Sequence, residues 1–187
     1  LAELAAQGAE LDHFAYSVKG LGIATEGDYT LVEDDVLYVD YGCVSEYYCS
    51  DSGFTLAMKP LSGDFERKYR ALRDCILAGS EALRPGTRAS AVPDAMWKVL
   101  RAHNVEVSFP HGHGIGLEVR DYPILVPSTG LNVRDDCIDE PADLVIEKNM
   151  VLNLEAPIFL PGSASLHIEQ TFVVGPQGAE PLTPQYR

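Results

Sequence analysis

Five residues spread along the chain have side chains that bind divalent metal ions: the carboxylates of Asp40, Asp51, Glu155 and Glu169 and the imidazole of His113. Carboxylate-rich ligation with one imidazole favours Mn, Fe or Co, with Zn also possible, over a structural zinc site lined by thiolates. The four carboxylates carry four negative charges, which two divalent cations neutralise. The set therefore predicts a two-metal centre that activates a water at neutral pH and polarises a carbonyl group.

A predicted β-hairpin must position the two aspartates. The strand in DVLYVDYG (35–42) ends near Asp40, and CSDSG (49–53) contains Asp51. A two-residue turn at Ser45 and Glu46 sets Asp40 directly opposite Asp51 on the same face. Opposed residues of this kind have Cβ atoms about 4.5–5.5 Å apart, so both carboxylates reach one ion.

A second predicted hairpin positions the two glutamates. A turn centred on Gly162 sets Glu155 opposite Glu169, and both lie in strongly apolar strands, NMVLNLEAPIFL (149–160) and SLHIEQTFVVG (165–175). Like charges that face each other on buried strands are destabilising unless something positive lies between them. Two such pairs in one chain predict bound cations.

Each residue taken alone has a plainer explanation. Asp51 and Asp40 both suit Asx turns at strand ends, and an isolated His113 is more often a hydrogen-bonded structural histidine. Glu155 and Glu169 are harder to explain in this way, because their strands have the pattern of core strands. Taken together, the five residues favour a metal site.

The remaining elements predict an α+β domain with strands at both ends of the chain and helices between them. ELDHFAYSVKG (10–20) alternates like a strand. Phe65, Tyr69, Leu72 and Ile76 repeat at helical spacing in residues 63–87, and Pro85-Gly86 end that helix. A second helix is expected over residues 90–105, with Ser90 as N-cap and Pro93 in its first turn. Residues 128–143 are polar, and an irregular stretch is expected there.

Composition excludes some classes of partner. The chain has 187 residues and a net charge of −14, from 28 acidic and 14 basic residues, which argues against nucleic acid and against anionic membranes. No apolar run approaches the roughly 18 residues of a membrane span, and no signal peptide is recognisable. The four cysteines form no C-x-x-C pair, so buried free thiols in a reducing cytoplasm are expected.

The metal-type residues resemble the pattern of the pita-bread metallopeptidases: methionine aminopeptidase, aminopeptidase P, prolidase and the related non-peptidase creatinase. That pattern joins an Asp-x-Gly strand, a second Asp 11 residues on, Gly-His-Gly-x-Gly-Leu, and glutamates on two closing strands. Here these segments are VDYG, CSDSG, GHGIGL, NLEAP and HIEQ. The similarity runs over nearly the whole chain. It implies a pita-bread catalytic domain over residues 1–187, with curved antiparallel sheets and flanking helices.

The resemblance also implies roles for individual residues. His113 would be the imidazole ligand and a catalytic residue, and Glu155 would be both a metal ligand and the proton shuttle beside the water. Gly112, Gly114 and Gly116 would let the backbone pass close to metals and substrate. His111 shares a strand face with His113 and is expected either to contact substrate or to be structural. His167 shares the face of Glu169 at a position where the family often has Arg, and is expected beside the substrate or behind the ligands.

Several positions depart from the family pattern. The family's peptidases usually have a histidine about 17 residues before the first Asp, where this chain has Ile23. A second histidine, seven residues after the metal histidine, is replaced by Arg120, and Asp121 stands in the place of the following glutamate. Arg120 stays protonated, so it cannot serve as a base, but it can clamp a substrate carboxylate or pair with Asp121. Phe54 replaces an arginine, and 148–150 replace a Pro-Gly-Met segment.

The predicted function is a dinuclear-metal hydrolase acting on a small peptide or small molecule, most simply an Xaa-Pro dipeptidase or aminopeptidase. A creatinase-like enzyme that cleaves a C–N bond in a small molecule is the alternative, favoured by Ile23 and Arg120. A catalytically inactive binding module is a third possibility, although the five retained ligands weigh against it. The chain opens in a stretch with the pattern of a helix interior, so a missing N-terminus and an upstream N-terminal domain are expected. A homodimer of the full-length protein and a cytoplasmic location are also expected.

Overall fold

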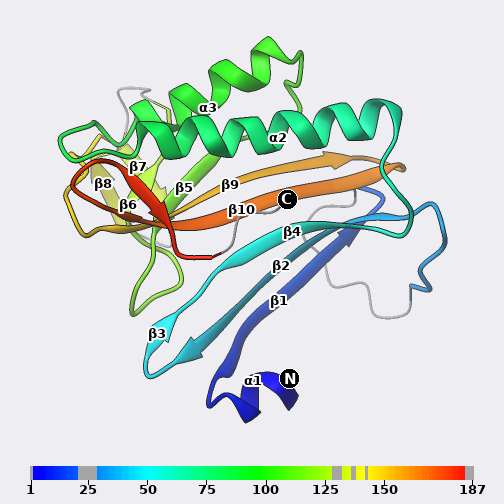
Figure 1. The fold of residues 1–187 in the computed structure, drawn as a ribbon, viewed down its shortest axis with the longest axis horizontal. Coiled ribbons are helices and arrows are strands. Elements are labelled where there is room, and N and C mark those ends of the chain that lie inside the picture. Colours follow the sequence, from blue (N-terminus) through cyan, green and yellow to red (C-terminus); the bar gives the residue numbers. More distant parts are fainter. Residues whose placement is uncertain (1, 21–28, 128–131, 136–137, 142, 184–187) are drawn as a thin grey trace.

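The computed structural model describes residues 2–20, 29–127, 132–135, 138–141 and 143–183. Two antiparallel sheets face each other, and two helices cover the outer face of one of them (Figure 1). This arrangement confirms the predicted α+β class with curved antiparallel sheets and flanking helices.

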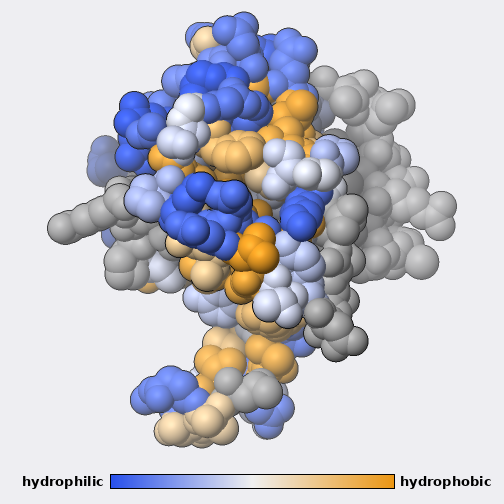
Figure 2. Space-filling view, turned by 90° about the vertical axis from the view of Figure 1, so that its right-hand side faces the viewer, coloured by the Kyte–Doolittle hydropathy of each residue, from blue (hydrophilic) through white to orange (hydrophobic). Residues whose placement is uncertain are grey.

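The first sheet is built around one strand. Strand β2 (Val36–Ser45) pairs with all three of its other members: β1 (Glu10–Val18), β3 (Tyr48–Cys49) and β4 (Ser52–Ala57). A short helix, α1 (Ala2–Ala6), precedes β1 and lies at the lower end of the molecule, where apolar and charged side chains lie side by side (Figures 1 and 2).

The second sheet has five strands, in the order β11 (Ala179–Pro181), β10 (Ala164–Val174), β9 (Val151–Leu160), β5 (His111–Gly114) and β6 (Asp121–Leu125). Helices α2 (Gly63–Ala82) and α3 (Ala91–Ala102) lie across it (Figure 1). Strands β7 (Asn132–Asp135) and β8 (Ile138–Pro141) form a hairpin, so the prediction of an irregular stretch was wrong there. None of the helices in the described ranges is long and apolar enough to cross a membrane.

Both helices lie where the apolar repeat predicted them. Leu72 and Ile76 of α2 are buried, while Phe65 and Tyr69 pack at the edge of the core. Ser90 is the N-cap residue of α3, as predicted, but its hydroxyl makes no capping bond. It donates instead to Asp143 Oδ1 at 2.7 Å and so ties the helix start to the segment before β9.

Strands β9 and β10 divide the protein into an apolar and a polar layer, because successive side chains of a strand point to opposite faces. Leu152, Leu154, Ala156 and Ile158 of β9 face the helices and belong to the main core, as do alternate residues of β10. The residues between them, including Glu155, point to the other face, toward the first sheet. The core thus supports the floor of the site described below.

The predicted register is confirmed for one hairpin and wrong for the other. Glu155 lies directly opposite Glu169, as predicted. Asp40 lies opposite Gly53 instead, because the two-residue turn comprises Glu46 and Tyr47, one position later than predicted. Asp51 therefore lies diagonal to Asp40 on the same face, still within the reach of a neighbouring side chain.

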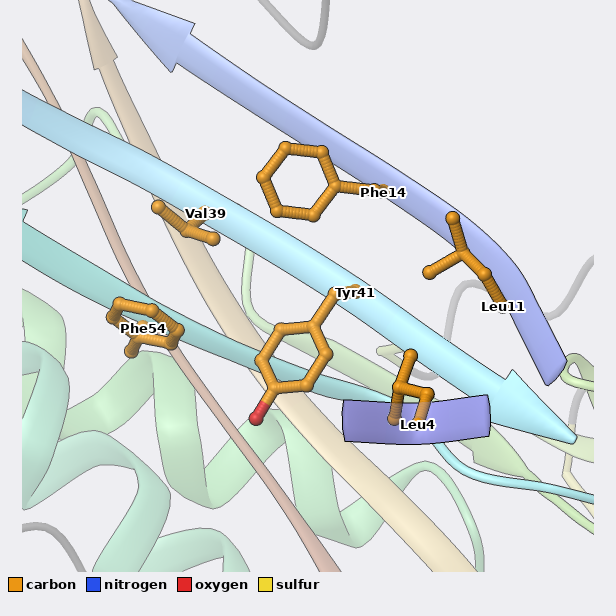
Figure 3. Close-up of a pocket in the computed structure, with 6 residues that line it drawn as sticks. All are labelled: Leu4, Leu11, Phe14, Val39, Tyr41 and Phe54. Atoms are coloured by element: carbon orange, nitrogen blue, oxygen red, sulfur yellow. The ribbon is translucent and has the colours of Figure 1, made fainter. Parts of the chain in front are cut away.

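The outer face of the first sheet has the opposite character. An apolar groove runs over it, lined by one residue of α1 and five from β1, β2 and β4 (Figure 3): Leu4, Leu11, Phe14, Val39, Tyr41 and Phe54. Phe54, at the position where relatives have an arginine, therefore points away from the carboxylates. Of the cysteines, Cys75 is buried as predicted, Cys43 and Cys49 are half-buried free thiols, and Cys137 lies outside the described residues.

Candidate metal centre

The five predicted ligands meet in one cavity between the two sheets. The cavity has a volume of about 400 Å³, and its walls include Asp40, Asp51, His113, Glu155 and Glu169. The Nε2 atom of His113 lies 3.5 Å from Asp51 Oδ2 and 3.8 Å from Glu155 Oε1, so the imidazole stands between the two hairpins.

The first hairpin supplies an aspartate end to this cavity. The hydroxyl of Tyr38 donates to Asp40 Oδ2 at 2.8 Å, and the hydroxyl of Thr171 donates to the backbone carbonyl of Asp51 at 3.2 Å. Asp51 is buried, and within the described part of the chain no group donates a well-formed hydrogen bond to its Oδ1 atom. A buried carboxylate oxygen in this state is costly unless a cation satisfies it.

A histidine that sequence reasoning missed, His13, lies at the same end. Its Nε2 atom is 3.0 Å from Asp40 Oδ1 and 3.3 Å from Asp51 Oδ1. Asp40 is the largest cause, followed by Asp51, of the rise of the His13 pKa to about 11, while burial opposes it. The two carboxylates therefore favour the imidazolium form of His13. In the structure His13 lies opposite Gly42 of VDYG, and this pairing follows a shift of register between Leu11 and His13 that regular alternation in the sequence does not predict.

The second hairpin supplies a glutamate end. Glu169 is buried and is contacted by the side-chain amide of Asn153 and, at 3.1 Å, by Nε2 of His167. Burial, followed by the negative charges of Asp51, Glu155 and Asp40, raises the pKa of Glu169 well above its usual range. Burial and the neighbouring carboxylates therefore favour the protonated form of this carboxyl group.

Glu155 lies in a different electrostatic environment although it faces Glu169. Burial alone raises its pKa, but a 2.7 Å contact with Nε2 of His111, followed by the charges of nearby histidines, outweighs burial and lowers the pKa to about 2. In turn, burial lowers the pKa of His111, and the Glu155 carboxylate more than compensates and raises it. The two facing glutamates thus have pKa values shifted in opposite directions.

Both histidines of the HGHG strand have one ring nitrogen occupied by the backbone. Nδ1 of His113 donates to the Gly114 carbonyl at 2.9 Å, and Nδ1 of His111 donates to the Phe109 carbonyl at 2.9 Å. That bond fixes the tautomer, so the Nε2 lone pair of His113 points to the carboxylates, as metal-binding histidines require.

The glycines around His113 make room for neighbouring backbone. A Cβ atom on Gly112 would lie 2.3 Å from the Asn153 carbonyl oxygen, and one on Gly114 would lie 2.3 Å from the Tyr122 carbonyl oxygen. At Gly116 the nearest atom would be 4.0 Å away, so neighbouring protein atoms leave room for a side chain there. At Gly53 a Cβ would meet the His167 ring at 1.9 Å.

The predicted substrate residues lie at different depths. His111 and Arg120 line the cavity. The side chain of His167 is fully buried behind Glu169 and beside the Tyr38 ring, a place that weighs against the predicted contact with substrate. Burial, as the largest cause, lowers the pKa of His167 to about 4. Ile23 lies outside the described residues.

The donor set fits divalent metal ions. Three groups of side chains have ligand atoms within 4.8 Å of one another: His13, Asp40 and Asp51; Asp51, His113 and Glu169; and Glu155, His167 and Glu169. Oxygen and imidazole donors in this number suit Mn, Fe, Co or Zn. The raised pKa of Glu169 shows that this carboxylate lacks positive charge around it.

Comparisons with known proteins agree with this chemistry. A family model for metallopeptidase family M24 matches residues 9–176. An uncharacterized peptidase of Staphylococcus aureus strain USA300 is 28% identical over 161 residues, which is 85% of this chain and 42% of that protein. An Xaa-Pro dipeptidase of Lactobacillus delbrueckii subsp. lactis is 28% identical over 156 residues, which is 82% of this chain and 39% of that protein.

A solved structure resembles the whole described fold. The dipeptidase PepE from Mycobacterium ulcerans is 28% identical, with a TM-score of 0.84, and the match covers 99% of this chain and 48% of that one. The chain therefore spans less than half the length of these relatives.

Proposed function

The chain belongs to metallopeptidase family M24, and on that premise we propose that it forms the catalytic part of a metal-dependent hydrolase that cleaves Xaa-Pro dipeptides or the N-terminal residue of Xaa-Pro peptides. One observation carries the proposal: four carboxylates and one imidazole from three separate regions meet in one cavity of about 400 Å³. The cavity is at the small end of the range for ligand sites, which suits a dipeptide.

The proposal assigns two divalent cations to Asp40, Asp51, His113, Glu155 and Glu169. When bound, they would supply a water of lowered pKa and a Lewis acid for a carbonyl oxygen. The protein's own part is to fix the ligands: Tyr38 orients Asp40, and the Gly114 carbonyl orients His113. Asn153 and His167 hold Glu169 from behind.

Glu155 is the residue we assign to proton transfer. It lies at the cavity wall, and its pKa of about 2 keeps it ionised. Its position beside the other ligands, rather than its basicity, supports the assignment. Its partner His111, at 2.7 Å, is placed to stabilise that charge. A general base must lie within hydrogen-bond reach of the proton it takes, and a wall position beside the ligands meets that condition.

Arg120 is the residue we assign to the substrate's carboxylate. It lines the same cavity, and its guanidinium keeps its charge at every physiological pH. A dipeptide carries a free carboxylate one residue beyond the scissile bond. Arg120 therefore favours a dipeptide over a long peptide, whose carboxylate lies farther from the metals.

The same arginine supports the second candidate, a creatinase-like hydrolase of a small molecule with a carboxylate and a C–N bond. The two differ in the group that water attacks: an amide carbonyl attached to a proline nitrogen, or the carbon of an amidine. The predicted upstream domain, homodimer and cytoplasmic location stay predictions.

The test is hydrolysis by the Mn²⁺-loaded protein of a panel of Xaa-Pro dipeptides, Xaa-Pro tripeptides, and small amidines and lactams. The proposal expects dipeptides to be cleaved with the highest kcat/KM, and chelator to abolish the reaction. Turnover of the amidines alone would favour the creatinase-like reading, and turnover of nothing by a metal-loaded protein would contradict both.

A further inference from the structure

We propose that His13 is a sixth protein ligand of the metal centre, completing the cation site formed by Asp40 and Asp51. The inference rests on the proposed function, because it needs the metal centre to exist. It adds a nitrogen donor from β1, a strand outside the two hairpins that carry the four carboxylate ligands.

The distances among the three side chains suit a shared ion. His13 Nε2 lies 3.0 Å from Asp40 Oδ1 and 3.3 Å from Asp51 Oδ1. Two ligand atoms that each lie about 2.1 Å from one metal are about 3.0 Å apart at a right angle and about 3.4 Å apart at a tetrahedral angle. Both separations fall in that interval, and the ligand atoms of the three side chains all lie within 4.8 Å of one another.

Asp12 prepares the imidazole for this role. Its Oδ2 atom lies 2.8 Å from His13 Nδ1, so the Nδ1–H group donates to Asp12. The lone pair of a neutral imidazole then lies on Nε2, the atom that faces Asp40 and Asp51. A carboxylate behind a histidine in this way is a common support of a metal-binding imidazole, which it orients and makes more basic.

The backbone is shaped to aim His13 inward. The pairing of β1 with β2 shifts between Leu11 and His13, which leaves Asp12 as an extra residue in the strand. Such bulges redirect the side chains that follow them. As a result Leu11 lines the outer apolar groove (Figure 3), while His13 lines the cavity.

Gly42 completes the fit. It lies opposite His13, and a Cβ atom there would be 2.5 Å from the His13 ring. The ring therefore occupies the space that a side chain at position 42 would fill. The glycine, the bulge and Asp12 together hold the imidazole against the two aspartates.

A competing arrangement gives a different result in the same experiment. If the His13 imidazolium replaces a cation at the aspartate end, the wild-type protein binds one metal ion and removal of the imidazole creates room for a second. If His13 is a ligand, removal of the imidazole weakens one of two ions.

The test is calorimetric titration of chelator-treated protein with Mn²⁺, for the wild type and for H13F, D12N and H103F. H13F keeps a planar ring and removes both nitrogens. D12N alters an exposed side chain, so it does not threaten folding. H103F is the matched control, because His103 also faces a carboxylate, Asp74 at 3.4 Å, but lies at the end of α3 away from the cavity.

The proposal expects two equivalents in the wild type and in H103F, with equal affinities. One of the two ions should bind at least about 100-fold more weakly in H13F and about 10–100-fold more weakly in D12N, the usual effect of losing a residue that supports a metal ligand. An H13F titration identical to the wild type, or tighter binding by H13F, would overturn the role of His13 while leaving the centre intact. Failure of the wild type to bind Mn²⁺ would overturn the metal centre, and His13 with it.

Discussion

The two hairpins that supply the carboxylates solve the same problem of charge repulsion in different ways. In the β9–β10 hairpin the two glutamates lie directly opposite each other, and burial and acidic neighbours raise the pKa of Glu169. In the β2–β4 hairpin the aspartates are diagonal, and the imidazole of His13 stands against both of them. At the aspartate end the carboxylates thus favour the protonated form of His13, whereas at the glutamate end burial and the acidic neighbours favour the protonated form of Glu169.

The difference indicates which end depends more on a cation. Opposed carboxylates were expected to need something positive between them, and at the aspartate end Asp40 and Asp51 favour the imidazolium form of His13. At the glutamate end the nearby His167 is neutral at physiological pH, because burial lowers its pKa to about 4. A cation held at each end, as proposed, would compete with a proton at Glu169 and with a proton at His13.

The largest expected effect comes from removing one ligand from either hairpin. D51A and E169A should each lower the turnover of Mn²⁺-loaded protein by at least about 100-fold, since changes behind a ligand already cost 10–100-fold. Steady-state kinetics on an Xaa-Pro dipeptide would measure it, with D94A, an exposed residue of α3, as control. Normal activity in either variant would show that the hairpin carrying the changed residue is not part of the catalytic site.

Metal removal should give the next largest effect. A ligand present at about 100 times its Kd stabilises the folded state by about 2.7 kcal/mol. For a chain of this length that corresponds to a Tm roughly 5–10 °C higher with Mn²⁺ than with chelator. Calorimetry of the wild type and E169A would show whether the gain depends on the glutamate end. Equal Tm values with metal and with chelator in the wild type would mean that the carboxylates hold no ion.

Gly53 is the point where the two hairpins touch. G53A would place a Cβ atom 1.9 Å from the His167 ring and 2.5 Å from Glu169 Oε2, and His167 is fully buried and has no room to move. We expect a loss of about 3 kcal/mol in the free energy of unfolding, at the upper end of the overpacking range. Denaturant unfolding measures it, and G116A, where the nearest atom would be 4.0 Å away, is the control. Equal losses in the two variants would show that the hairpins are not tightly packed.

Thr55 joins the hairpins through the backbone of β10. Its hydroxyl donates to the His167 carbonyl at 2.9 Å and accepts from the His167 N–H group at 2.8 Å. T55V keeps the shape and leaves both backbone groups without these bonds, which should cost about 2 kcal/mol in the same unfolding experiment. T87V is the control, because Thr87 does not lie between the two sheets. If T55V were as stable as the wild type, the bonds between Thr55 and the His167 backbone would contribute nothing to stability.

The register of the two hairpins shows what the sequence could predict. Pro161-Gly162 marks the β9–β10 turn, and Gly162 has a positive φ of 74°, so the glutamate pair was predicted correctly. The β2–β3 turn uses Glu46 and Tyr47 at φ values of 50° and 72°, a conformation that normally requires Asn, Asp or Gly. With no such residue to mark it, the turn was misplaced by one position and the pairing by two.

His13 was missed for a related reason. Regular alternation along β1 puts residue 13 on the same face as Leu11, which lines the outer groove. The extra residue at Asp12 reverses the face, and a bulge leaves no clear mark in the sequence. The five metal-type residues, by contrast, were found because their residue types and spacing did not depend on the register of any one hairpin.

The most direct test of the account is anomalous diffraction from crystals of the protein soaked with Mn²⁺. Two anomalous peaks are predicted in the cavity, one beside Asp40 and Asp51 and one beside Glu155 and Glu169, each within about 2.0–2.2 Å of carboxylate oxygens. The account would be contradicted by a map from crystals saturated with Mn²⁺ in which those four side chains contact only histidines, tyrosine and each other.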